Sequence, residues 1–222
     1  ISMIFQEPSA ALNPVMTVGT QIEETIQLHS DLSRKKAHER AIKLLDMVGI
    51  PNPEKRVNQY PFEFSGGMQQ RAMIAMAMCC DPELLIADEP TTALDVTVQA
   101  QVLEQLDKLR KRTGTTLIII THNLGIVARY ADSVKIMYGG KLVEQGPTRE
   151  VFRNPRHPYT MGLIRAVPRL DRPRTESLYT IEGEPPDMSQ IPAQSCAFAS
   201  RCKYATEECR TCLLYTSDAA DE

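Results

Sequence analysis

The stretch that decides the fold is Leu84-Leu85-Ile86-Ala87-Asp88-Glu89-Pro90. Its four apolar residues predict a short buried strand, and two carboxylates follow where that strand ends. In open α/β sheets, ligands bind at the carboxyl ends of the strands. Asp88 is therefore placed to hold Mg²⁺, and Glu89 is placed to orient or activate a water molecule. Taken alone, the stretch fits a strand that ends in a solvated acidic turn equally well.

Strands and helices alternate along the chain on both sides of this stretch. Short apolar runs predict strands at residues 1–5 and 117–120, and helical spacing of apolar residues predicts helices at residues 17–29, 33–48, 66–80 and about 98–109. Gly139-Gly140 separates two further apolar runs and predicts a hairpin turn. The alternation predicts an α/β domain whose central strands are mostly parallel.

Three further features lie at the ends of predicted elements. Ser65-Gly66-Gly67 opens a helix, where free backbone amides attract phosphate and the glycines let it approach closely. Gln6 and His122 each follow a predicted strand, where they could contact a metal ion, a water molecule or a γ-phosphate. Each feature also has an ordinary structural interpretation, such as an N-cap serine or a structural histidine.

Together, in this order, the features resemble the ATP-binding-cassette (ABC) ATPases of membrane transporters. The matching segments are Gln6 with the Q-loop, residues 64–68 with the signature motif, residues 84–88 with Walker B, Glu89 with the catalytic glutamate, residues 93–95 with the D-loop, and His122 with the switch histidine. Phe64 and Met68 depart from the usual Leu and Gln of the signature, whose Ser-Gly-Gly centre is intact. The resemblance covers about residues 1–150.

The resemblance implies a P-loop NTPase-type α/β cassette with a helical subdomain at about residues 10–80. Two cassettes pair head to tail in this family, and ATP bound to one is covered by Ser65, Gly66 and Gly67 of the other. The resemblance adds Gln6 and Asp95 to the ATP site. It further implies that Asp88 and Gln6 hold Mg²⁺, that Glu89 polarises the attacking water, and that His122 contacts the γ-phosphate.

The family's phosphate-binding loop has no counterpart in this sequence, which contains no Gly-x4-Gly-Lys-Ser/Thr motif. In the family that loop precedes the Q-loop, and its lysine and backbone amides hold the phosphates. The resemblance therefore implies a partial cassette whose N-terminal part is missing. On this interpretation, the chain alone neither binds ATP tightly nor hydrolyses it.

Five segments together resemble the dipeptide and oligopeptide importer subfamily: residues 8–14, 146–148, 154–160, 183–186 and 196–202. Residues 151–211 would then form that subfamily's small C-terminal extension. The resemblance implies peptide import at the cytoplasmic face of a bacterial inner membrane. The implied partners are a second ATPase subunit, identical or different, transmembrane permease subunits and, indirectly, an extracytoplasmic solute-binding protein. The alternatives are an importer for nickel or another solute and a soluble ABC ATPase outside transport.

A group of cysteines near the C-terminus indicates a metal or cluster site. Cys196, Cys202 and Cys209 resemble the set that binds a [4Fe-4S] cluster in some subfamily members, and such a cluster takes four thiolates. Cys212 offers a fourth, but residues 212–222 resemble the translation of a sequencing-library adaptor. We therefore expect a cluster in the intact protein rather than in this chain. The alternative is a compact extension with buried cysteines.

The composition excludes some function classes. Lys and Arg number 25 and Asp and Glu number 28, which gives a net charge of −3. A chain of this charge does not bind nucleic acid by bulk positive charge, so no nucleic-acid partner is expected.

Overall fold

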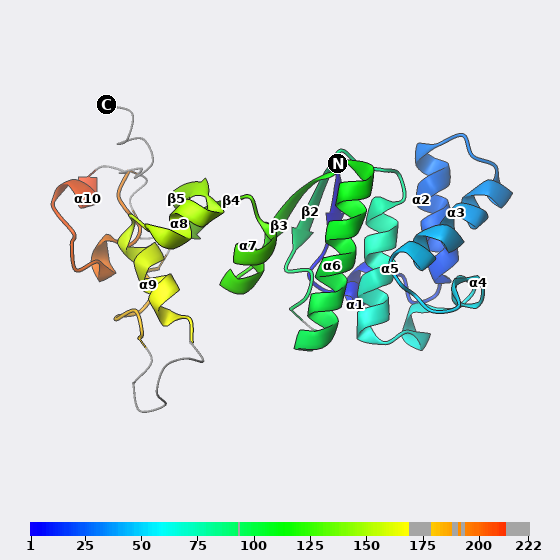
Figure 1. The fold of residues 1–222 in the computed structure, drawn as a ribbon, viewed down its shortest axis with the longest axis horizontal. Coiled ribbons are helices and arrows are strands. Elements are labelled where there is room, and N and C mark those ends of the chain that lie inside the picture. Colours follow the sequence, from blue (N-terminus) through cyan, green and yellow to red (C-terminus); the bar gives the residue numbers. More distant parts are fainter. Residues whose placement is uncertain (93, 169–178, 188–190, 192–193, 212–222) are drawn as a thin grey trace. The chain divides into compact units, whose positions relative to one another are not determined.

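A computed structural model describes residues 1–222 except residues 93, 169–178, 188–190, 192–193 and 212–222 (Figure 1). The chain forms two compact units, Ile1–His122 and Asn123–Glu222. Within the described residues, no helix combines the length and the apolar character needed to cross a membrane. Residues 168–192 are rich in proline and charge, which predicts a linker. Most of that linker, and all of the segment that resembles an adaptor, lie outside the described residues.

A three-stranded parallel sheet forms the centre of the N-terminal unit. Its strands are β1 (Ser2–Ile4), β2 (Leu84–Asp88) and β3 (Thr116–Ile120), in the order β1-β2-β3. Ile4 pairs with Ala87, and Asp88 pairs with Ile120. The predicted parallel sheet is confirmed, and the register aligns the carboxyl ends of all three strands.

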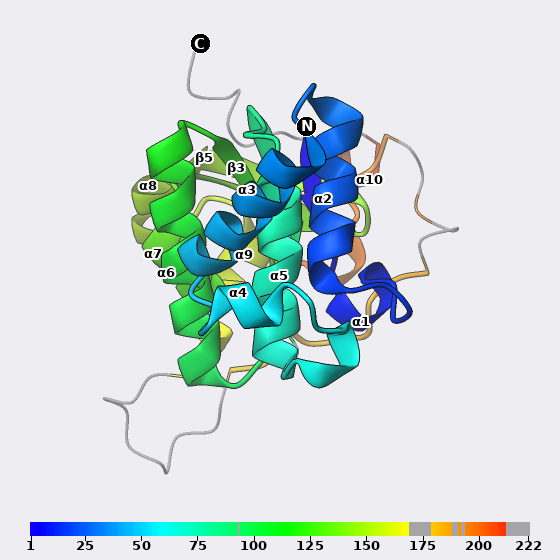
Figure 2. The same cartoon turned by 90° about the vertical axis from the view of Figure 1, so that its right-hand side faces the viewer.

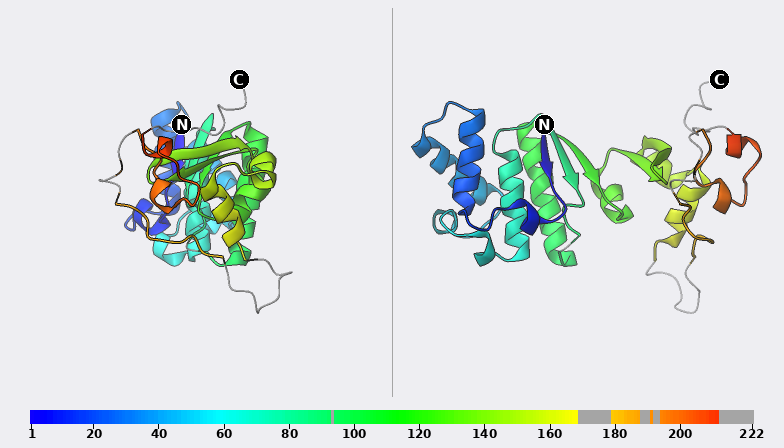
Figure 3. Two further views of the ribbon diagram at one scale, coloured as in Figure 1. Left: turned by 90° about the vertical axis from the view of Figure 1, so that its left-hand side faces the viewer. Right: turned by 180° about the vertical axis from the view of Figure 1, so that it is seen from behind.

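Two helices, α5 (Gly66–Met78) and α6 (Val96–Thr113), lie side by side over one face of this sheet (Figure 1). Their apolar residues pack with Leu85 and Ala87 in one buried core. The view from behind looks onto the strands themselves (Figure 3). On β3, Ile118 and Ile120 are about half exposed, so this apolar strand is not buried on both faces.

The remaining elements of the N-terminal unit are helical. They are α1 (Pro8–Ala11), α2 (Val18–His29), α3 (Arg34–Met47), α4 (Pro53–Arg56) and the 3₁₀ turn η1 (Pro61–Glu63). Helices α2 and α3 pack against each other and against α5 (Figure 2). Val18, Ile22 and Ile26 are four residues apart and form a buried stripe along α2. Ser33 occupies the N-cap position of α3, but its side chain makes no capping hydrogen bond.

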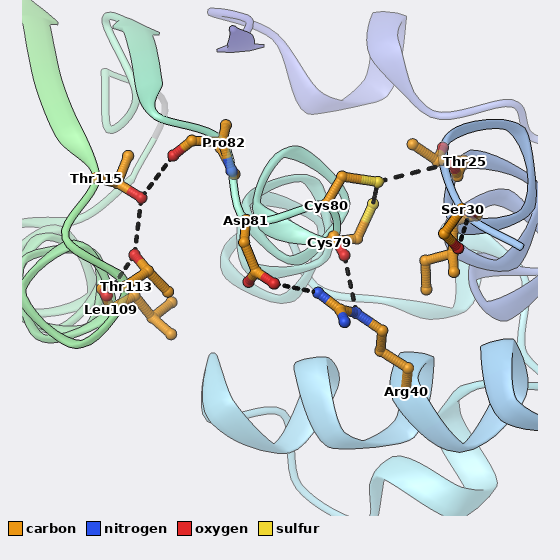
Figure 4. A network of polar contacts seen from close by, with 11 residues as sticks. Thr25, Ser30, Arg40, Cys79, Cys80, Asp81, Pro82, Leu109, Thr113 and Thr115 are labelled. Atoms are coloured by element: carbon orange, nitrogen blue, oxygen red, sulfur yellow. Dashed lines mark hydrogen bonds and ion pairs between the residues drawn. The ribbon is translucent and has the colours of Figure 1, made fainter. Parts of the chain in front are cut away.

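Helix α5 ends at Met78, two residues before the predicted end at Cys80. The turn that follows is held by Arg40 of α3, which donates to the Cys79 carbonyl at 2.9 Å and to the Asp81 carboxylate at 2.6 Å (Figure 4). Asp81 adopts a left-handed backbone conformation with φ of 46°. A helix cannot continue through that conformation, so α5 cannot extend beyond Cys80.

The C-terminal unit is built on a hairpin. Strands β4 (Ser133–Tyr138) and β5 (Lys141–Pro147) are antiparallel and meet at Gly139-Gly140, as predicted. Both glycines have positive φ, 54° and 74°, which the tight turns of hairpins favour. The helical elements of this unit are α7 (Leu124–Tyr130), α8 (Thr148–Arg153), α9 (Pro158–Ala166), η3 (Ala199–Arg201) and α10 (Glu208–Thr211).

The core of the C-terminal unit brings the hairpin, α9 and the segment before η3 together. The ring centroid of Tyr138 lies 4.5 Å from that of Tyr159 and 5.2 Å from that of Phe198. The guanidinium of Arg201 donates to the Tyr138 hydroxyl at 3.0 Å. Residues near 198 are therefore anchored to the hairpin through one aromatic cluster.

Candidate functional site

The predicted polar residues meet at one edge of the parallel sheet. Gln6 comes two residues after β1, Glu89 directly after β2, and His122 two residues after β3. The common direction and register of the strands place all three side chains at the carboxyl edge, where α/β sheets bind ligands. Gln6 and His122, which are both far from Glu89 in the sequence, therefore contact it.

The backbone of Glu89 is unusual. Its φ is 43°, in the left-handed region that non-glycine residues rarely adopt. Its amide donates to the Ile120 carbonyl at 2.9 Å, so β3 holds the turn in place. Strain of this kind costs on the order of 1–3 kcal/mol and is concentrated at functional sites. No residue type in this stretch indicates the conformation, because glycine is the residue expected there.

The Glu89 carboxylate collects three hydrogen-bonding partners. Oε1 lies 2.9 Å from Nδ1 of His122, while Oε2 accepts from Nε2 of Gln6 at 3.1 Å and from Oγ1 of Thr92 at 2.8 Å. These bonds favour the ionised form, and the pKa of Glu89 is lowered, first by the His122 bond and next by the Thr92 bond. Glu89 is thus held as an oriented carboxylate.

His122 contacts Glu89 through one ring nitrogen only. Donation from Nδ1 to the carboxylate leaves Nε2 of a neutral imidazole as an acceptor, and a protonated ring would offer a second donor there. The His122 side chain is 71% exposed, so this second nitrogen is accessible to a ligand. The geometry suits contact with a phosphate oxygen.

Asp88 and Gln6 provide further oxygen atoms at the same edge. Asp88 is the last residue of β2 and is half-buried. Gln6 uses its amide nitrogen to bind Glu89, which directs one end of the amide to the carboxylate and leaves the amide oxygen as a separate acceptor. Carboxylate and amide oxygens are ligands that Mg²⁺ accepts.

The Ser65-Gly66-Gly67 segment begins α5, as predicted. Ser65 is the N-cap residue, and its Oγ accepts the Met68 amide at 3.4 Å. Ser65 and Gly66 are exposed, and a Cβ built on Gly66 would have open space around it. The amides of this first turn are therefore accessible to an anion from outside the chain.

Asp95 begins the neighbouring helix α6. Its Oδ1 accepts the amides of Thr97 at 3.1 Å and Val98 at 3.0 Å. A Cβ on Gly67 would lie 2.8 Å from Cγ1 of Val98, so the starts of α5 and α6 lie against each other. Asp95 thus has a structural capping role beside its predicted ATP role. Ala93, the first residue of the predicted D-loop, lies outside the described residues.

Thr92 is the site residue that the sequence analysis missed. Its hydroxyl donates to Glu89, and its amide donates to the Glu89 carbonyl at 3.3 Å. One sequence signal could have identified Thr92: it is a hydroxyl residue three positions after Glu89, in the turn that begins at Pro90.

The three described C-terminal cysteines belong to one segment, and each sulfur has a polar neighbour. Cys196 lies 3.8 Å from Nε2 of His157, Cys202 accepts the Tyr204 amide at 3.4 Å, and Cys209 lies 3.5 Å from Oγ1 of Thr206. The Cys196 amide donates to the Cys209 carbonyl at 2.8 Å.

The environments of these thiols differ. Burial raises the pKa of Cys196, and the Thr206 hydroxyl lowers the pKa of Cys209. Across the part of the chain that the structure describes, no three His, Cys, Asp or Glu side chains gather closely enough to hold one ion. Cys212 lies outside that part.

Two protein-family models match this chain. Residues 1–92 match the family described as ABC transporter, and residues 143–209 match the family described as oligopeptide/dipeptide transporter, C-terminal region. The first match contains Gln6, the Ser65-Gly66-Gly67 segment and Glu89, and the second contains His157 and the three cysteines.

Curated relatives and a solved structure show the same similarity. The chain is 55% identical over 205 residues to the oligopeptide transport ATP-binding protein OppD of Bacillus subtilis (strain 168), covering 92% of this chain and 57% of that protein. It is 52% identical over 202 residues to the dipeptide transport ATP-binding protein DppD of the same strain, covering 91% and 60%.

Among solved structures, the chain is similar to the ATP-binding cassette MJ0796, a dimer in a post-hydrolysis state bound to ADP and Pi. The TM-score is 0.58 at 26% identity, and the match covers 67% of this chain and 62% of that one. The chain thus spans less than two thirds of the length of these proteins.

Proposed function

This chain belongs to the ABC transporter ATPase family, with the C-terminal region of oligopeptide and dipeptide transporters, and from that premise we propose that it is part of an ATPase subunit that powers the import of di- or oligopeptides. The domain assignment is part of the proposal: residues 1–150 contribute to the cassette, with a helical subdomain at about residues 10–80, and residues 151–211 form the extension.

The observation that carries the proposal is the triply bonded Glu89 carboxylate. Water attack on a γ-phosphate needs a group that orients the water, and catalysis in this class rests on positioning and charge stabilisation. Glu89 is held ionised at the sheet edge by His122, Gln6 and Thr92. It orients the attacking water, and His122 presents its second nitrogen to the γ-phosphate of ATP.

Mg²⁺ would be held by Asp88 and by the amide oxygen of Gln6. The two residues supply the hard oxygen donors that this ion prefers, and they stand beside Glu89 at one sheet edge. When bound, the ion neutralises phosphate charge. Gln6 would then link the ion to Glu89, because its amide nitrogen already binds that carboxylate.

A second cassette subunit is the proposed partner of the Ser65-Gly66-Gly67 segment. Its exposed amides are open to an anion from outside the chain, and the dimeric solved relative supports pairing. We assign Asp95, at the adjoining start of α6, to the same interface. The subunit would act at the cytoplasmic face of a bacterial inner membrane with permease subunits and, indirectly, an extracytoplasmic solute-binding protein.

Reconstitution tests this function directly. The full-length protein and its permeases are placed in vesicles with the solute-binding protein, and ATP hydrolysis and uptake are measured with a dipeptide, an oligopeptide and Ni²⁺. Peptide-stimulated hydrolysis coupled to peptide uptake supports the proposal. Stimulation by Ni²⁺ alone would establish the metal importer, and ATPase activity indifferent to the permeases would establish a soluble ATPase outside transport.

For the C-terminal cysteines we propose ligation of an iron–sulfur cluster by the intact protein. The support is that each of the three sulfurs lies at hydrogen-bonding distance from a polar group, an arrangement that orients thiolate ligands and tunes clusters. The three described side chains are not gathered around one point, so binding requires them to come closer together. Iron and sulfide analysis of anaerobically purified full-length protein tests this proposal.

A further inference from the structure

A cavity in the C-terminal unit is formed by β4, β5, α8 and the turn after α8, elements that lie together in Figure 1. Its volume is about 580 Å³. One water molecule takes only about 30 Å³ in the liquid, and small-molecule sites typically measure about 300–1,000 Å³. All the lining residues are described and belong to this one unit. The cavity therefore has room for a small organic molecule.

Charges of both signs line this cavity. Lys135 of β4 and Arg156, which follows α8, are positive, and Glu144 of β5 and Glu150 of α8 are negative. Within the described part of the chain, none of these four side chains forms an ion pair. Their charges are therefore available to a ligand.

Glu144 is the buried member of this set, with only 6% of the residue exposed. Its Oε1 accepts the Arg156 amide at 2.8 Å, and its Oε2 accepts the His157 amide at 3.1 Å. Both oxygens thus act as acceptors, as those of an ionised carboxylate do, and each retains further acceptor capacity. Burying a carboxylate costs free energy that neutral amides offset only in part. A cationic group that enters the cavity would supply the missing charge.

A ligand of a single charge fits this lining poorly. A simple anion would meet the two glutamates, and a metal ion would meet Lys135 and Arg156. In addition, among the described residues no three His, Cys, Asp or Glu side chains gather closely enough to hold a metal ion. A molecule that carries one charge of each sign satisfies both pairs.

We propose that this cavity binds a small zwitterion, a short peptide with a free amino end and a free carboxyl end. Its ammonium group binds Glu144 and Glu150. Its carboxylate binds Lys135 and Arg156, whose guanidinium matches a carboxylate with two parallel hydrogen bonds. The site lies apart from the residues assigned to ATP and Mg²⁺, so the inference does not rest on the proposed function.

Two neutral side chains favour a peptide over a free amino acid. Gln145 and Asn154 are exposed and also line the cavity. Each side-chain amide offers both a donor and an acceptor, which are the groups that a peptide bond pairs with. A dipeptide is the smallest ligand that uses these amides as well as the four charges.

The first measurement compares ligands on the 222-residue chain by ¹H–¹⁵N NMR titration. The probes are L-alanyl-L-alanine, its N-acetylated form, its C-amidated form and free L-alanine. We expect each capped dipeptide to bind about tenfold more weakly than the free one, since each loses a hydrogen bond between charged groups. The backbone amides of Lys135 and Gln145 should shift.

Equal binding of either capped dipeptide would overturn the zwitterion, and shifts confined to residues away from the cavity would overturn its location. Alanine should bind more weakly than the dipeptide, because it lacks the peptide group. If alanine binds as tightly as the dipeptide but loses affinity when either of its ends is capped, the zwitterion stands and its source is a free amino acid.

The second measurement uses two variants that each remove one charge. We expect Arg156→Gln to weaken the dipeptide about tenfold but to leave the amidated form almost unchanged. Glu150→Gln should likewise weaken the dipeptide but not the acetylated form. Glu144 is left intact because it holds two backbone amides. Arg149→Gln is the matched control, because Arg149 is an exposed neighbour of Glu150 that does not line the cavity.

Equal losses for all three dipeptide forms in either variant would overturn the assignment of the charges, and so would an equal loss in the Arg149→Gln control. The titration is then repeated with the full-length protein. Binding of the free dipeptide with a similar affinity supports a site of the intact protein. Binding by the 222-residue chain alone would overturn that conclusion.

Discussion

Glu89 Oε1 lies 2.9 Å from His122 Nδ1 and joins two residues that are 33 positions apart in the sequence. The contact follows from the pairing of β2 with β3, which sets Asp88 opposite Ile120. The left-handed turn at Glu89 then fixes where its carboxylate lies, and the amide of the same residue is tied to Ile120. Backbone and side chain of Glu89 are thus both anchored to the strand that leads to His122.

Replacing Glu89 with glutamine should separate ATP binding from hydrolysis. In the full-length protein, E89Q keeps the size of the side chain but removes the ionised carboxylate that orients water. We expect ATP turnover to fall by about 10²–10⁴-fold, the range for a missing general base. ATP-dependent pairing should persist, as measured by analytical ultracentrifugation. Turnover near that of the unmodified protein would contradict the role of Glu89.

Removing the His122 ring should raise the pKa of Glu89. The hydrogen bond from His122 is the largest cause of the lowered pKa, so His122→Ala should raise the pKa of Glu89 toward that of an ordinary glutamate. Carboxyl ¹³C NMR of the chain across pH 2–7 (roughly the range that brackets this value) measures the shift. Gln6→Ala serves as the matched control and should give a smaller change, since its bond contributes less.

The sign of the associated stability change is determined by the direction of that shift. A carboxylate whose pKa is lower in the folded than in the unfolded state stabilises the fold above its unfolded pKa and loses that contribution as the pH falls through the folded pKa. The unmodified chain should therefore tolerate mild acid better than the His122→Ala variant. Equal acid stability together with an unchanged Glu89 titration would rule out the bond as the cause.

The sequence was sufficient to predict the parallel sheet and which side chains meet at its edge. Strand ends and residue order determine that edge, because parallel strands bring their carboxyl ends together. It did not predict the left-handed Glu89 or the Thr92 bond, since both depend on the local path of the chain after β2. The same reason applies to the turn after α5, where Arg40 of another helix binds the Asp81 carboxylate.

The C-terminal unit was predictable in part. The two glycines between apolar runs identified the hairpin, whose positive φ angles they accommodate. The relation between His157 and Cys196 was not predictable, because it joins residues 39 positions apart across the core of the unit. The spacing of apolar residues within a helix or strand does not indicate such a contact.

Adding a methyl group to Gly19 should destabilise the helical part of the N-terminal unit. A Cβ there would lie 2.4 Å from Cγ2 and 2.5 Å from the carbonyl oxygen of Val57, and the Gly19 amide donates to that same oxygen at 2.8 Å. A backbone neighbour cannot move aside as a side chain can, so Gly19→Ala should cost about 1–3 kcal/mol, as overpacking does.

Gly66→Ala is the matched control for this effect, because nothing lies within 4 Å of its added Cβ. We expect its free energy of unfolding to change by less than about 0.5 kcal/mol, as at other open sites. Urea unfolding followed by far-UV circular dichroism suits both variants, since the chain has no tryptophan. Equal stability of the two variants would contradict the close packing at Gly19.

The adjacent thiols of Cys79 and Cys80 should differ sharply in reactivity although their sulfurs are 3.6 Å apart (Figure 4). Cys79 is 1% exposed, and burial, aided by the neighbouring Cys80 thiol, raises its pKa to about 12. Cys80 is exposed. At about pH 8, iodoacetamide should therefore modify the exposed Cys80 and spare Cys79 in the folded chain. Mass spectrometry of peptides separates the two.

The raised pKa of Cys79 also predicts a loss of stability in alkali. The thiol stays protonated in the folded chain after its unfolded counterpart has ionised, so the stabilising contribution is complete below the unfolded pKa and declines as the pH rises above it. Between about pH 9 and 11 the free energy of unfolding should fall by up to about 1.4 kcal/mol per pH unit from this group. Cys79→Ala should flatten that decline, whereas Cys80→Ala should leave most of it. If the decline is the same in both variants, burial of Cys79 is not its source.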